Sequence, residues 1–155
     1  MDKLGKVLDV LIVILLFVGV GFRIFFTPVV VDGSSMFPTL KNGDYLVLEK
    51  GSKNVSRGDI VAVYSDTLEK TLIKRVIAIE GDTIKINGSK IYVNDVLLDE
   101  SAYINSDWGC EIEEDKVPSG KVFVLGDNRN NSTDSRVLGY LNIADIKGTY
   151  VLKLF

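Results

Sequence analysis

The segment TLIKRVIAI, residues 71–79, decides the fold class. It is rich in β-branched and other apolar residues, a composition that favours a strand. After Pro28 the sequence contains no long segment with the 3.6-residue apolar period of a helix. The sequence therefore predicts a mainly β domain, built as an antiparallel sheet or small β-barrel. Runs similar to residues 71–79 lie at Tyr45–Leu48, Ile60–Tyr64, Thr83–Ile86, Ile91–Val93, Lys121–Leu125 and Thr149–Leu154.

Turn signals separate these runs. Asn87-Gly88 is the dipeptide most typical of a tight hairpin. Gly-Asp pairs recur at strand boundaries, where ordinary turn chemistry explains them. The segment 99–118 is polar and acidic, and we predict that it is an inserted loop without catalytic chemistry. We interpret its cysteine, Cys110, as a partly packed thiol.

The N-terminal segment is strongly apolar. No side chain from Val10 to Phe22 is charged, and the stretch from Val7 to Phe26 has about 20 residues, enough for a helix to cross a bilayer. A cleaved signal peptide and a buried core helix are the alternatives. Residues 22–26 contain no small-x-small cleavage motif, which disfavours the signal peptide. Pro28 discourages continuation of the helix.

The charges around the apolar stretch predict an orientation. Lys3 and Lys6 precede it, and the positive-inside rule places that end in the cytoplasm. We therefore predict a single-pass protein of the cell membrane with two parts. Residues 1–27 form a cytoplasmic tip and a transmembrane anchor in the lipid bilayer, and residues 28–155 form an extracytoplasmic β-rich domain.

Residue counts exclude several classes of function. The 18 basic and 21 acidic residues give a net charge of −3, so no strong basic field favours nucleic acid as a partner. The 155 residues contain no histidine, which excludes a Ser-His-Asp triad, a Cys-His dyad and a His-ligated zinc centre. A single cysteine excludes an internal disulfide and a multi-cysteine metal cluster. Nucleophilic catalysis in this chain needs another base.

Lys74 is the candidate base. Strand alternation cannot place both Lys74 and Arg75 on one face, so we expect one of these cations to point inward. Burial disfavours an ammonium ion and lowers the pKa of a lysine from about 10.4. A neutral lysine can then accept a proton as a general base. A solvated strand lysine is the alternative.

Two further segments can carry chemistry. Residues 33–40, GSSMFPTL, hold a serine on a turn stiffened by proline, although most Gly-Ser pairs are simply turns. Residues 126–136, GDNRNNSTDSR, form a dense polar loop after a predicted strand. Asp134 and Arg136 can make a charge-assisted pair that fixes this loop. A calcium loop is discounted, because Asp127 does not begin an EF-hand register.

Together, these segments resemble the sequence boxes of bacterial type I signal peptidases (leader peptidases), which are serine–lysine dyad peptidases. The resemblance spans roughly residues 1–148, and the short chain with one anchor is similar to the Gram-positive-type enzymes. The matching motifs are Ser35-Met36-x-Pro38-Thr39-Leu40, Lys74-Arg75-Val76 followed by Gly81-Asp82, and Gly126-Asp127-Asn128-Arg129 followed by Ser132 and Asp134-Ser135-Arg136.

The resemblance implies a role for each matching residue. Ser35 would be the nucleophile that forms an acyl-enzyme, and Lys74 its general base. Ser132 stands at the position whose hydroxyl orients that lysine. Asp134 and Arg136 match the structural pair that supports the site.

Two residues depart from the pattern of some family members. Gly33 stands where those members supply a serine hydroxyl to the oxyanion hole, which leaves main-chain donors or water in that role. Asn130 stands where some members have aspartate, a position without a catalytic role.

The resemblance also implies a substrate. The enzyme would be a membrane-anchored serine endopeptidase that removes N-terminal signal peptides from secretory preproteins after Ala-x-Ala-like small residues. The substrate would bind extended against an exposed strand, with shallow apolar pockets near Ile73 and near Val31–Gly33. No metal or other cofactor is implied, because a serine–lysine pair needs neither. The oligomeric state is not predicted.

Two other functions compete with this one. A self-cleaving repressor-type serine–lysine protease would need a DNA-binding helix-turn-helix, and the N-terminal region is an apolar span instead. A tethered β-domain that binds exported or pilus proteins without cutting them would not need Ser35 or Lys74, and this chain has both.

Overall fold

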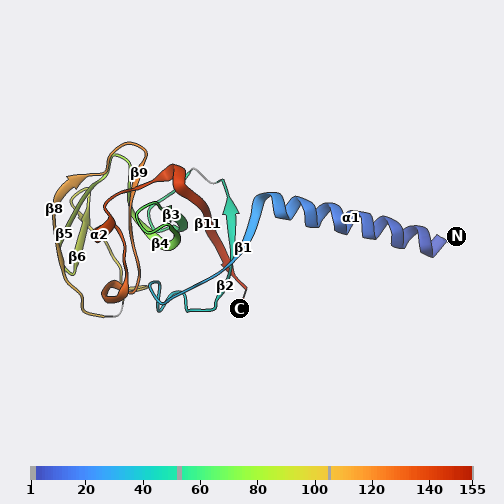
Figure 1. Ribbon diagram of the computed structural model, residues 1–155, viewed down its shortest axis with the longest axis horizontal. Coiled ribbons are helices and arrows are strands. Elements are labelled where there is room, and N and C mark those ends of the chain that lie inside the picture. Colours follow the sequence, from blue (N-terminus) through green and yellow to red (C-terminus); the bar gives the residue numbers. More distant parts are fainter. Residues whose placement is uncertain (1–2, 52–53, 105, 155) are drawn as a thin grey trace.

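The computed structural model describes residues 3–51, 54–104 and 106–154, and it consists of one long helix and two antiparallel sheets (Figure 1). The larger sheet has the strand order β1-β2-β11-β3-β4-β9-β10, and the smaller has the order β7-β6-β5-β8. The strands are β1 (Phe26–Val30), β2 (Tyr45–Lys50), β3 (Ile60–Ser65), β4 (Lys70–Ile79), β5 (Thr83–Gly88), β6 (Lys90–Val93), β7 (Val96–Leu97), β8 (Cys110–Lys116), β9 (Lys121–Leu125), β10 (Leu141–Asn142) and β11 (Ile146–Lys153). The helical elements are α1 (Lys3–Phe25), α2 (Ser135–Leu138) and two 3-10 turns, Arg129–Asn131 and Ile143–Asp145.

The mainly β fold class predicted from the sequence is confirmed. All strand pairs are antiparallel. The seven predicted runs fall on β2, β3, β4, β5, β6, β9 and β11, with ends that differ by a few residues. The predicted hairpin is the one between β5 and β6, but its turn is shifted by one residue: Asn87 pairs with Lys90, so Gly88 and Ser89 form the turn.

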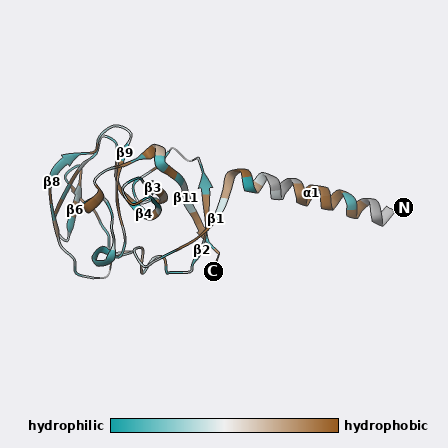
Figure 2. Cartoon of the chain, viewed as in Figure 1, coloured by the Kyte–Doolittle hydropathy of each residue, from teal (hydrophilic) through white to brown (hydrophobic). Residues whose placement is uncertain are grey.

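Helix α1 projects away from the sheets (Figure 1), and brown, hydrophobic turns are prominent along it in Figure 2. The segment Val7–Phe25 is long and apolar enough to cross a membrane, and none of its described side chains is buried within the protein. This exposure disfavours a buried core helix. Lys50 Nζ donates a hydrogen bond to the carbonyl of Arg23 at 2.9 Å, which joins the helix end to β2. Met1 and Asp2 of the predicted cytoplasmic tip lie outside the described residues.

Strand β1 begins directly after the helix and crosses the predicted boundary between residues 27 and 28. Its residues pair in register with β2, from Phe26 opposite Glu49 to Val30 opposite Tyr45. Pro28 is accommodated because β1 is an edge strand, where a missing N–H removes no bond from a ladder on its free side.

The predicted loop at 99–118 is partly wrong. Its second half contains β8, which pairs with β5 and completes the smaller sheet. Four acidic residues in CEIEEDK hide the alternation of this strand in the sequence. Asn105, in the first half of the segment, lies outside the described residues.

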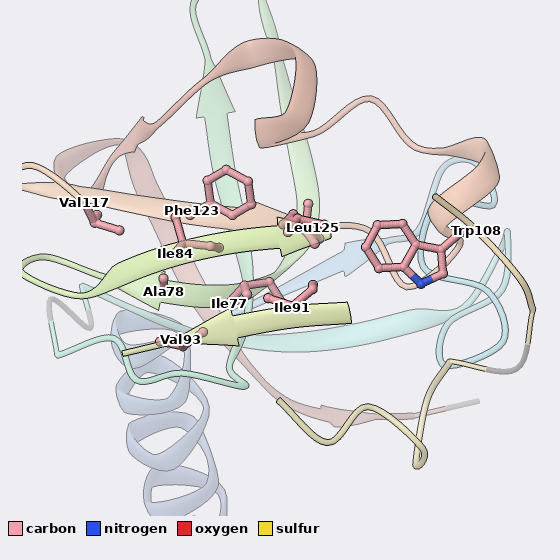
Figure 3. Packing of buried hydrophobic residues seen from close by; sticks show 10 residues of the cluster. Ile77, Ala78, Ile84, Ile91, Val93, Trp108, Val117, Phe123 and Leu125 are labelled. Atoms are coloured by element: carbon pink, nitrogen blue, oxygen red, sulfur yellow. The ribbon is translucent and has the colours of Figure 1, made fainter. Parts of the chain in front are cut away.

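Three hydrophobic clusters hold the sheets together. One lies between the two sheets and is formed by Ile77 and Leu125 from the larger sheet, Ile84 and Ile91 from the smaller, and Trp108 (Figure 3). A second lies on the larger sheet and is rich in valine. The third packs residues 36 and 40 against β2 and β3, which fixes the turn that carries Ser35; its members are Val31, Met36, Leu40, Leu46 and Ile60.

Candidate active site

Ser35 lies on a turn that the core holds from both sides. Met36 and Leu40 are each only 1% exposed, so burial anchors the chain immediately after the serine. Phe37 N–H donates to the carbonyl of Ser34 at 3.1 Å and closes the turn. Gly33, at φ +97°, makes the sharp bend before it in a conformation that other residues rarely adopt. The side chain of Ser35 is therefore presented on a rigid support.

Lys74 is the inward cation of β4. It pairs with Val61 of β3 and is 3% exposed. Its Nζ lies 2.6 Å from Ser35 Oγ and donates a second hydrogen bond to the carbonyl of Ile73 at 3.1 Å. The structure thus brings together the two residues that the sequence singled out as nucleophile and base.

The environment of Lys74 favours its neutral form. Burial lowers its pKa from 10.5 to about 8, and the positive charge of Lys70 acts in the same direction. The carboxylate of Asp134 opposes this shift. With a pKa of about 8, roughly a tenth of Lys74 is unprotonated at pH 7 and half at pH 8, which supplies the neutral form that a general base requires.

The polar loop at residues 126–136 closes over the serine turn. Asn128 N–H donates to the carbonyl of Ser35 at 2.9 Å, and its side-chain amide donates to the carbonyl of Ser34 at 3.0 Å. Asn131 Nδ2 donates to Ser34 Oγ at 3.0 Å. The sequence analysis named Asn128 only as part of a matching motif and gave neither asparagine a role, although the density of polar groups in the loop was a signal.

Asp134 and Arg136 form a close ion pair. Arg136 Nε and Nη2 donate to the carboxylate at 2.8 and 2.9 Å, and Gly126 N–H donates to it at 3.0 Å. Burial would raise the pKa of Asp134, but the hydrogen bonds from Arg136 and Gly126 lower it overall. Asp134 therefore stays ionised and ties the two ends of the loop together.

Ser132 lies in the same cleft as Ser35 and Lys74. Lys74 Nζ hydrogen-bonds to Ser35 and to the carbonyl of Ile73, so within the described residues the bond from Ser132 to Lys74 that the resemblance implies is not formed. The buried Oγ of Ser132 makes no hydrogen bond of normal geometry to any described residue, but it faces Asp134 and helps to lower the pKa of that carboxyl.

The loop can pack closely against the serine turn because residue 126 is glycine and has no side chain. A Cβ at Gly126 would lie 2.5 Å from the carbonyl oxygen of Ser35 and would also overlap the side chain of Ser132.

A second ion pair, missed in the sequence, lies beside this loop. Arg75, on the opposite face of β4 from Lys74, donates to both carboxylate oxygens of Asp127 at 2.9 and 2.7 Å. Thr39 Oγ1 donates to the same carboxylate at 2.5 Å. The pair therefore links β4, the loop and the segment that follows the serine.

A cleft of about 660 Å³ opens beside Ser35 and Lys74. Strand β1 forms one wall, the start of β4 a second, and residues 130–133 a third. Both polar and apolar groups line it, among them Val29, Val31, Gly33, Leu72, Ile73 and Ser132. In the described part of the chain, no three His, Cys, Asp or Glu residues are grouped as a metal site would require.

Comparisons with known proteins agree with this geometry. The family model "Signal peptidase, peptidase S26" matches residues 4–155. The chain is 36% identical over 146 residues to signal peptidase I U of Bacillus subtilis, an alignment that covers 85% of this chain and 77% of that protein. It is 38% identical over 139 residues to probable signal peptidase I-1 of Synechocystis, covering 83% and 70% of the two chains.

The fold has a similar solved counterpart. A crystal structure of a signal peptidase I from Enterococcus faecalis superposes with a TM-score of 0.52 at 30% sequence identity. The match covers 63% of this chain and 97% of that one. With a family model that matches nearly every residue, relatives of the same kind and a similar structure, the chain belongs to the signal peptidase family, peptidase S26, and is a hydrolase of the signal peptidase I type.

Proposed function

We propose that this chain is a membrane-anchored serine endopeptidase that removes signal peptides from secretory preproteins, with Ser35 as nucleophile and Lys74 as general base. The observation that carries the proposal is the 2.6 Å contact between Lys74 Nζ and Ser35 Oγ, made by a lysine that is 3% exposed. Neutral lysine can take the serine proton without histidine, which this chain lacks.

The reaction proceeds in two halves. In the first, Lys74 Nζ accepts the proton of Ser35 Oγ as that oxygen attacks the carbonyl carbon of the scissile peptide. The tetrahedral intermediate collapses when Lys74 returns the proton to the departing amine, which leaves the signal peptide as an ester on Ser35. In the second, Lys74 accepts a proton from water, the resulting hydroxide attacks the ester, and Ser35 Oγ regains a proton.

The oxyanion of the intermediate needs a donor. Within the described chain, the backbone N–H of Ser35 donates no hydrogen bond and is available for this role. Gly33 has no hydroxyl to contribute, so we assign the stabilisation to main-chain donors. Preorganised donors of this kind contribute about 3–4 kcal/mol to transition-state binding in other acyl-transfer enzymes.

Three supporting residues act around the dyad. Ser132 carries a buried hydroxyl in the cleft that Lys74 lines, where it makes no hydrogen bond of normal geometry to the described residues, and we assign it the role of orienting the amine once the serine proton has moved. Asp134 raises the pKa of Lys74 and holds the amide of Gly126. Arg136 neutralises Asp134 and keeps it in place.

The cleft suits an extended peptide. β1 pairs only with β2, so its other edge can pair with a substrate strand. Val29, Val31 and Ile73 supply an apolar lining near the dyad, which favours small apolar side chains at the −1 and −3 positions, as in Ala-x-Ala.

The membrane arrangement follows from α1. A helix with the exposed, apolar segment Val7–Phe25 would span the bilayer with its N-terminus in the cytoplasm. Residues 28–155 would then lie on the extracytoplasmic side, close to the surface where a membrane-held preprotein presents its cleavage site. Tethering both reactants to one membrane raises their effective concentration.

Two substitutions test the proposal. Ser35→Ala and Lys74→Ala in the full chain are each expected to abolish cleavage of a labelled preprotein that carries Ala-x-Ala, as followed by mass spectrometry of the fragments. The exposed residues Ser89 and Lys85 provide matched controls, and Ser89→Ala and Lys85→Ala should cleave at the wild-type rate. Full activity in either dyad variant would overturn the assignment, and a wild-type chain that binds the preprotein without cutting it would favour a tethered binding domain.

A further inference from the structure

Three residues between β7 and β8 pack behind the active site, against Arg129 of the 126–136 loop and Arg75 of β4. Glu100, Tyr103 and Trp108, here called the outer cluster, come from the segment to which the sequence assigned no chemistry. Each of them touches an arginine that belongs to the site or flanks it. The outer cluster is therefore joined to the site by specific contacts, whereas an incidental surface loop would lie apart from it.

The central contact is an ion pair between Glu100 and Arg129. The side chains are 9% and 0% exposed, so the pair is removed from solvent. Both Nη atoms of Arg129 donate to the carboxylate. Tyr103 OH donates a third hydrogen bond to it at 3.0 Å, and burial raises the pKa of Tyr103, which keeps that donor protonated. A buried arginine of this kind depends on its carboxylate partner, because an unpaired charge in the interior is strongly unfavourable.

Arg129 in turn holds the main chain of the loop. Its Nε donates to the carbonyl of Gly126 at 3.0 Å. The ring of Trp108 lies 4.7 Å from the guanidinium carbon and covers one face of it. Figure 3 shows this indole beside Leu125, the last residue of β9, so Trp108 is itself fixed by the core.

From the loop the contacts reach the nucleophile. The amide of Asn128 lies between Gly126 and Arg129 in the chain and donates to the carbonyl of Ser35 at 2.9 Å. Glu100 is thus linked to Ser35 by two contacts, the ion pair with Arg129 and the backbone hydrogen bond from Asn128 to Ser35. A second route runs through Tyr103, whose ring lies 4.0 Å from the guanidinium carbon of Arg75, the partner of Asp127.

We propose that Glu100 is a positioning residue of the active site, which holds Arg129 and the 126–131 backbone so that Asn128 fixes the main chain of Ser35 against Lys74. This role rests on the proposed function of Ser35 and Lys74. Tyr103 and Trp108 assist by holding the carboxylate and covering the arginine. The segment between β7 and β8 thereby supports catalysis without touching the substrate.

The test uses Glu100→Gln in the full, detergent-solubilised chain. This variant keeps the size of the side chain and removes its charge. We expect kcat for preprotein cleavage to fall at least tenfold, with a smaller change in KM, because the dyad geometry is disturbed more than the cleft. Glu113→Gln is the matched control, since Glu113 is an exposed acid on β8, and it should retain wild-type kcat. Glu100→Asp, which keeps the carboxylate, should recover part of the lost kcat.

Hydrogen exchange supplies a readout that does not depend on activity. In Glu100→Gln, peptides covering residues 126–131 should exchange at least tenfold faster, whereas peptides from β3 should be unchanged. If Glu100→Gln does not fold, Tyr103→Phe, which removes one hydrogen bond to the same carboxylate, is expected to show the same local pattern at smaller amplitude. Wild-type exchange at 126–131 or wild-type kcat in the folded variant would overturn the positioning role. An inactive wild-type chain with the expected exchange pattern would instead count against the proposed function alone.

Discussion

The Nζ of Lys74 and the Oγ of Ser35 lie 2.6 Å apart although 39 residues separate them in the sequence. The contact arises because β4 carries the lysine into the interior while a core-anchored turn presents the serine. A buried amine beside a hydroxyl is the minimal arrangement for histidine-free activation of serine. Under the proposed mechanism, this contact lets a chain with no histidine activate a serine.

The rate of cleavage should follow the deprotonation of Lys74. Burial lowers the pKa of Lys74 to about 8, so kcat/KM is expected to rise about tenfold per pH unit below that value and to level off above it. The measurement is kcat/KM for a peptide substrate from pH 5.5 to 10. A profile that is flat across this range would show that another group controls the reaction.

Replacing Lys74 should stabilise the folded protein while it destroys activity. The difference between 10.5 and about 8 corresponds to roughly 3 kcal/mol of unfavourable ammonium burial. Below about pH 8 the lysine is protonated in both states, so this cost is fully present. The cost declines as the pH rises from about 8 to 10.5, because over this range only the unfolded chain still binds the proton. In thermal unfolding, the melting temperature of Lys74→Met should exceed that of the wild type at pH 7, and the difference should be smaller at pH 9.5. A variant less stable than wild type at pH 7 would contradict this.

Lys70 should lower the pKa of Lys74 without contacting the bond that is cleaved. It lies on the same face of β4 as Lys74 and lines the same cleft, and its charge lowers the pKa of Lys74. Lys70→Met is therefore expected to move the acid limb of the pH profile to higher pH at low salt. The shift should shrink at 1 M salt, where charges are screened over about 3 Å. Lys85→Met, on the exposed face of β5, should leave the limb in place, and an equal shift in both variants would argue against a local effect.

Gly126 should tolerate no side chain. A Cβ there would lie 2.5 Å from the Ser35 carbonyl oxygen, so Gly126→Ala must displace either the serine turn or the loop. We expect cleavage to fall more than a hundredfold, with a lower melting temperature.

Gly109 provides the matched control for that substitution. A Cβ at Gly109 would meet nothing within 4 Å, and its φ is not positive. Gly109→Ala should therefore keep wild-type activity and melting temperature. If Gly126→Ala and Gly109→Ala have the same activity and melting temperature, the close approach at Gly126 does not matter for function.

The sequence predicted the parts of the fold that have a local signal in composition or periodicity. The β-branched runs, the Asn87-Gly88 hairpin and the apolar N-terminal helix each carry a local signal that tertiary contacts reinforce. Alternation also predicted that one of the adjacent cations Lys74 and Arg75 points inward, but it did not say which; Lys74, at 3% exposure, is the one beside Ser35.

The missed features depend on contacts between distant segments. Strand β8 is hidden by its acidic residues, and its pairing with β5 supplies the order that its own composition lacks. The bonds that Asn128 donates to the serine turn and that Arg129 donates to Glu100 join irregular loops, for which no periodicity exists. For Ser132 the family resemblance predicted a hydrogen bond to Lys74, and the described part of the structure does not contain that bond.

The most direct test of the account is the titration of Lys74 itself. Lysine labelled with ¹³C at Cε and incorporated into the full chain in detergent reports its protonation by NMR, and Lys74→Arg identifies its signal. The account predicts a midpoint near pH 8 that coincides with the acid limb of kcat/KM. A midpoint at the ordinary value of a solvated lysine, with an active enzyme at pH 7, would contradict it.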